Sequence, residues 1–137
     1  MKYFAVSEFV RSETADKRGI DNRLPKDLLP NVQALVDNVL DPLREAWGKP
    51  IIVSSGYRCP ALNKAVKGSA TSDHMRGCAS DITVGSRKEN KRLFNLIQSL
   101  GLPFDQLIWE KGNLTGPDWV HVSFRRDGEN RKQIFAL

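Results

Sequence analysis

Both histidines of this 137-residue chain stand a short, fixed distance from a carboxylate. His74 opens a segment that ends at Asp81, and His121 closes a segment that begins at Asp118. Two imidazoles and one carboxylate suit zinc better than magnesium or calcium, which prefer shells made only of oxygen. Three such ligands leave a fourth position open, as in catalytic zinc sites, and a spare carboxylate can then accept a proton. We therefore expect His74, Asp81 and His121 to bind zinc, with Asp118 close by.

Strand alternation supports this grouping. Side chains of a strand point alternately to its two faces, so a strand over residues 119–124 turns His121 away from its apolar face. The same alternation over residues 79–84 turns Asp81 to the polar face of a second strand. His74 can reach the same point from the preceding loop. The alternative is that the two histidines are unrelated surface groups and Asp81 is a strand-end carboxylate.

The elements that position these residues can be read from the spacing of apolar side chains. Apolar residues recur every three or four positions over residues 26–47 and 87–100, which predicts two amphipathic helices. Pro42 interrupts the first helix and is expected to kink it. Shorter helices are predicted at 4–10 and 59–66, and strands at 51–55, 79–84, 106–110 and 119–124. This order predicts a single α+β domain over residues 1–137, with an antiparallel sheet and helices packed on one side.

Composition places the chain among ordinary globular proteins. Hydrophobic residues make up 40% and charged residues 27%, with a formal net charge of +5. The basic residues either form a solvated surface or attract an anionic polymer such as nucleic acid or cell wall. Aromatic interleaving and a recognition-helix pattern are missing, so a nucleic-acid partner is not expected. No apolar run is long enough to span a bilayer, so no stable membrane insertion is expected, and we expect a monomer.

The first residues and the two cysteines bear on the compartment. The start of the chain lacks the apolar core and cleavage site of a secretory signal, so we expect synthesis in the cytoplasm. Cys59 and Cys78 could form one disulfide, but the cytoplasmic start favours free thiols. Their spacing does not match a Cys-x-x-Cys metal or redox motif.

Three segments resemble one known family. Residues 72–81, SDHMRGCASD in one-letter code, resemble the S-x-H-x-x-G-x-A-x-D signature of the zinc D-alanyl-D-alanine peptidases. This group includes D-alanyl-D-alanine carboxypeptidases and dipeptidases and the phage L-alanyl-D-glutamate endolysins. Residues 118–121 resemble its second signature, and residues 55–58, followed by Leu62 and Asn63, resemble the segment with the active-site arginine. The matches run in family order and cover about half of the chain.

The resemblance implies a role for each matching residue and a fold of the Hedgehog/DD-peptidase type. Asp118 would be the general base, which takes a proton from the attacking water and later gives it to the leaving amine. Arg58 would stabilise the developing oxyanion and, with Ser72, contact the substrate. The dipeptidases carry Glu at the position of Asp118, so this chain is more similar to the carboxypeptidase and endolysin branches.

The implied activity is hydrolysis of stem peptides in bacterial cell wall (peptidoglycan) by a zinc peptidase. A D-alanyl-D-alanine carboxypeptidase and an L-alanyl-D-glutamate endopeptidase are both compatible with the residues. The alternative is a non-catalytic, zinc-containing cell-wall binding module of the same fold, which would need neither Asp118 nor Arg58. A phage or prophage lysis enzyme of this kind would act on the wall after release from the cytoplasm.

Overall fold

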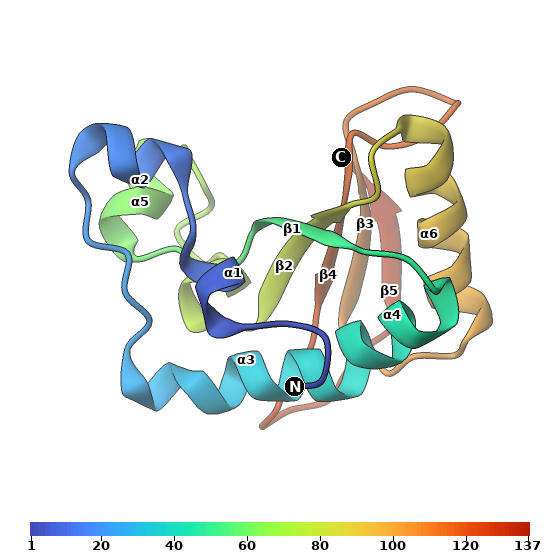
Figure 1. The fold of residues 1–137 in the computed structure, drawn as a ribbon, viewed down its shortest axis with the longest axis horizontal. Coiled ribbons are helices and arrows are strands. Elements are labelled where there is room, and N and C mark those ends of the chain that lie inside the picture. Colours follow the sequence, from blue (N-terminus) through green and yellow to red (C-terminus); the bar gives the residue numbers. More distant parts are fainter.

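Five strands form one sheet in the order β1-β2-β4-β3-β5 in the computed structural model, which describes residues 1–137 (Figure 1). Their bounds are β1 Ile52–Ser55, β2 Ala79–Thr83, β3 Gln106–Glu110, β4 Trp119–Ser123 and β5 Gln133–Ala136. The first four strands pair antiparallel, as predicted, whereas β5 runs parallel to β3 at the edge. Strand β5 was not predicted, because all four of its residues are exposed and show no apolar alternation.

The chain also forms six α-helices. Their bounds are α1 Val6–Val10, α2 Glu13–Arg18, α3 Leu29–Leu35, α4 Asp41–Trp47, α5 Pro60–Ala65 and α6 Arg87–Ser99. Figure 1 shows α3, α4 and α6 against the sheet, whereas α2 and α5 lie together beyond one end of it. None of the helices is long and apolar enough to cross a membrane.

The helix predicted over residues 26–47 continues through its internal proline. A π-helical turn, Val36–Leu40, joins α3 to α4, and Pro42 stands in the first turn of α4. Proline has no backbone N–H to donate to the preceding turn, and a π turn is one of the ways in which a helix absorbs such a defect. The interruption expected at Pro42 is therefore a local change of helical pitch.

The core lies between one face of the sheet and the helices α3, α4 and α6. Ile82, Val120 and Val122 are fully buried in neighbouring strands, opposite helix residues such as Leu93 and Ile97. The side chains that alternate with these strand residues point to the other face. Because that face is not covered by the three core helices, polar groups of β2, β3 and β4 can line a cleft there.

Candidate metal centre

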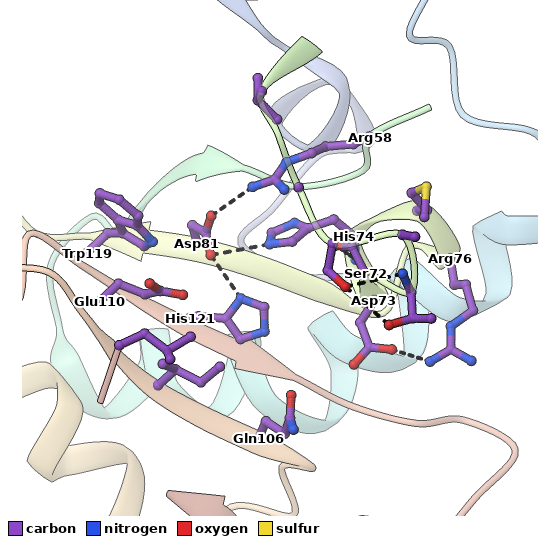
Figure 2. Close-up of a pocket in the computed structure, with 18 of the residues that line it drawn as sticks. Arg58, Ser72, Asp73, His74, Arg76, Asp81, Gln106, Glu110, Trp119 and His121 are labelled. Carbon is purple, nitrogen blue, oxygen red and sulfur yellow. Dashed lines mark hydrogen bonds and ion pairs between the residues drawn. The ribbon is translucent and has the colours of Figure 1, made fainter. Parts of the chain in front are cut away.

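Three buried side chains meet on the open face of the sheet. His74, Asp81 and His121 are 3%, 5% and 9% exposed, and one potential ligand atom from each lies within 4.8 Å of the others. Oδ1 of Asp81 is 3.3 Å from Nε2 of His74 and 3.1 Å from Nδ1 of His121 (Figure 2). The structure thus brings together the three ligands that the sequence predicts.

Register and a tight turn explain this meeting point. Asp81 of β2 and His121 of β4 are direct partners across the antiparallel pair, so their side chains leave the sheet on the same face. His74 lies in a 3₁₀ turn, Asp73–Arg76, whose first residues are capped by the hydroxyl of Ser72, 3.2 Å from the His74 amide. Gly77 ends this turn with φ of +72°, a conformation that glycine adopts without strain.

A backbone carbonyl fixes the ring of His74. Its Nδ1 is 2.7 Å from the carbonyl oxygen of Gly56, so Nδ1 donates its proton to that oxygen and Nε2 is the nitrogen turned toward Asp81. A Cβ added to Gly56 would lie 2.6 Å from the Cα of Phe9 in α1. Glycine is therefore required at this position, because the chain passes too close to α1 for any side chain.

Arg58 holds the other oxygen of Asp81. Its Nη2 is 3.3 Å from Oδ2 of Asp81, and its Nε donates to Oγ of Ser55 at 3.1 Å. A contact of 3.5 Å joins its Nη1 to Oδ1 of Asn63. The structure thus places Arg58 at the site, where its guanidinium orients a ligand carboxylate.

Burial and charge act in opposite directions on Asp81. Burial disfavours its ionised form, but the neighbouring imidazoles of His74 and His121 outweigh this and hold the pKa of Asp81 well below its usual range. The carboxylate therefore stays negative although it is buried, and it can neutralise a bound cation.

The donor set fits zinc. Two imidazole nitrogens and one carboxylate oxygen are the ligand types of catalytic zinc sites. Here the three atoms lie close enough together to bind one ion. The hydrogen bond of His74 to a backbone carbonyl and the contact of Asp81 with Arg58 are the outer-shell support that zinc ligands ordinarily have.

Comparison with protein-family models gives one match, which spans residues 2–123 and is described as Peptidase M15. The chain belongs to the Peptidase M15 family. It is therefore a zinc metallopeptidase, which confirms the resemblance and the α+β fold predicted from sequence. No curated protein matches the chain. Residues 124–137, including β5, lie beyond the matched region of this M15 domain.

The three candidate ligands of the M15 domain lie in a large cleft. Its volume is about 1040 Å³, and its walls include the loop of residues 66–72 and the C-terminal residue Leu137. The predicted substrate-binding residues Arg58 and Ser72 also line it. A cleft of this size is large enough for a short peptide.

The structure does not bring Asp118 to the three ligands. Its carboxylate accepts a hydrogen bond from Nε of Arg87 at 2.8 Å, and it does not line the cleft. Asp118 comes directly before Trp119, whose side chain shares the face of His121, so the pleat of β4 directs the Asp118 side chain to the opposite face. It lies there against the first residue of α6.

Glu110 occupies the place expected for a spare carboxylate. Ile108 of β3 pairs with His121, and Glu110 follows two positions later, so its side chain leaves the same face (Figure 2). Burial and then the negative charge of Asp81 raise the pKa of Glu110. The sequence analysis did not single out this residue, because only the pairing of β3 with β4 shows that it lies beside the ligands.

Proposed function

We propose that this M15 domain hydrolyses peptide bonds in the stem peptides of bacterial peptidoglycan, with zinc held by His74, Asp81 and His121. The observation that carries the proposal is a buried His-Asp-His cluster that opens into a cleft of about 1040 Å³. Bound there, zinc would act as a Lewis acid toward the scissile carbonyl and the attacking water. Membership of the M15 family supports this substrate class.

The residues around the ligands have separate tasks in this proposal. Arg58 orients Asp81 through its contact with Oδ2, and its exposed edge in the cleft would stabilise negative charge that develops on the carbonyl oxygen. Ser72 acts mainly through the turn it caps, since its hydroxyl accepts from the His74 amide. A substrate contact of Ser72 stays a prediction from the resemblance.

The charge of the cleft favours an anionic peptide. Six lysine and arginine residues line it, against three aspartate and glutamate residues. Stem peptides carry free carboxylates, which such a surface attracts. The substrates of a D-alanyl-D-alanine carboxypeptidase and of an L-alanyl-D-glutamate endopeptidase both carry such carboxylates. The proposal therefore has two versions, which differ in the peptide bond that is cut.

Product analysis on defined muropeptides tests the proposal. The purified protein should contain about one zinc per chain and release a fragment whose mass identifies the cleaved bond. Loss of terminal D-alanine would mark a carboxypeptidase, and release of the whole peptide after L-alanine would mark an endopeptidase. Asp81→Asn should lose both zinc and cleavage, whereas Asp16→Asn, at an exposed position of α2, should keep both. Uncut muropeptides from zinc-loaded protein would contradict the proposed substrate.

A further inference from the structure

Two carboxylates stand side by side at one end of the β3–β4 pair. Glu110 is the register partner of Trp119, and the amide of Asp118 donates to the carbonyl oxygen of Glu110 at 2.9 Å. Their backbones are therefore adjacent, but their side chains leave opposite faces of the sheet. Only one of them can serve the ligand cluster.

The surroundings of Asp118 hold it away from the cleft. Its carboxylate pairs with Arg87 at 2.8 Å, and its carbonyl oxygen accepts from Nδ2 of Asn90 at 3.0 Å. Both partners belong to α6, which packs on the core face of the sheet. To reach the ligand cluster, this carboxylate would have to leave Arg87 and cross the plane of its own strand.

The surroundings of Glu110 leave its carboxylate free. It lines the cleft with the three ligands and accepts no hydrogen bond from the protein (Figure 2). The nearby indole Nε1 of Trp119 is buried and has no partner either. Buried donors are nearly always satisfied, so this N–H is left for the Glu110 carboxylate or for an oxygen of the substrate.

We propose that Glu110, and not Asp118, is the catalytic proton acceptor and donor of this peptidase. The assignment rests on the proposed function. Glu110 takes one proton from water as the water oxygen bonds to the carbonyl carbon. It then gives that proton to the amide nitrogen as the carbon–nitrogen bond breaks. The products are one carboxylic acid and one amine, and Glu110 returns to its ionised form.

A matched pair of variants tests the assignment. Glu110→Gln should keep about one zinc per chain and an unchanged KM, while kcat falls by about 10²- to 10⁴-fold, the usual contribution of a positioned acid–base group. Asp118→Asn should keep zinc and lose less than about tenfold in kcat. A large loss of kcat in Asp118→Asn, or a kcat near wild type in Glu110→Gln, would overturn the assignment.

A second measurement needs no turnover. Acetohydroxamate can be titrated into the Co²⁺-substituted protein and followed by visible absorption, since the hydroxyl proton of this metal-binding acid is accepted by a neighbouring carboxylate. Its affinity should fall at least about tenfold in Glu110→Gln and stay unchanged in Asp118→Asn. Equal affinities in the two variants would overturn the assignment. A wild-type protein that binds the probe with this difference but leaves muropeptides intact would contradict the proposed substrate alone.

Discussion

The molecule contains two buried aspartates with positive or potentially positive partners, and they differ in what those partners are. Asp81 contacts two imidazoles and one guanidinium. Asp105, which comes directly before β3 and is 0% exposed, contacts two guanidinium groups. Arg131 binds both of its oxygens at 2.9 Å, and Nε of Arg125 lies 3.2 Å from Oδ2.

The difference between an imidazole and a guanidinium explains the two environments. Hydrogen bonds from Arg131 hold the pKa of Asp105 below its usual range, and a guanidinium stays charged at any pH at which proteins fold. An imidazole loses its proton near neutral pH and then offers a lone pair. Asp105 is therefore permanently neutralised, whereas Asp81 and its two neighbouring imidazoles can share a metal ion.

The largest expected effect concerns the cluster of Asp105 with Arg125 and Arg131. Asp105→Asn removes the charge that Arg125 and Arg131 share and should lower the free energy of unfolding by about 3 kcal/mol. This is the lower end of the range for a broken buried pair, because both arginines reach solvent. Urea unfolding measures it, with Asp127→Asn at an exposed ion pair as the control expected to change little. An unchanged midpoint in Asp105→Asn would remove the distinction between the two clusters.

Bound metal should raise the free energy of unfolding only through the cluster of His74, Asp81 and His121. Zinc at about 100 times its dissociation constant should raise the free energy of unfolding by about 2.7 kcal/mol in the wild type and in Asp105→Asn. Asp81→Asn should show no such increase, because it lacks the charged ligand. Unfolding curves with and without zinc test this. An equal increase in Asp81→Asn would mean that the stabilising zinc binds elsewhere.

The guanidinium beside Asp81 should tune metal affinity without itself binding metal. Arg58→Gln removes the partner of Oδ2 and should weaken zinc binding by about 10- to 100-fold, the usual cost of losing outer-shell support. Competition with a chromophoric chelator measures this change. Arg23→Gln, at a surface ion pair, should bind zinc like the wild type.

The smallest effect concerns acid unfolding. Because the folded pKa of Asp105 is lowered, its contribution is fully present above the unfolded value of about 3.9 and is lost as pH falls through the folded value. The stability contributed by this group should therefore decline below about pH 4, by at most about 1.4 kcal/mol per pH unit. Asp105→Asn should show a shallower decline in metal-free protein, measured by thermal unfolding at several pH values. Equal slopes would contradict this.

The meeting of His74, Asp81 and His121 could be predicted because motif and strand alternation agreed. Asp81 and His121 each lie within a strand whose apolar face is unambiguous, so their direction could be predicted. Four of the five strands, β1 to β4, and the two long helices could likewise be predicted from apolar patterns. This local information was sufficient wherever one face of an element is buried and the other is polar.

The proposed catalytic carboxylate, Glu110, and the edge strand β5 depend on information that is not local. Asp118 was placed at the site by analogy with a signature, although the alternation that directs His121 to the cleft directs a residue three positions earlier to the other face. Glu110 becomes visible only when β3 is paired with β4 in a particular register. The pairing of β5 with β3 likewise joins residues far apart in the sequence, and the residues of β5 have no buried face.

The close approach of Gly56 to Phe9 extends the metal centre to the N-terminal helix. The amide of Tyr57 donates to the carbonyl oxygen of Phe9, so α1 sets the direction of the Gly56 carbonyl, which in turn sets the tautomer of His74. Coupling between two sites is reciprocal. A bound ion should therefore slow hydrogen exchange at the Tyr57 amide, and loosening of α1 should raise the rate at which the ion dissociates.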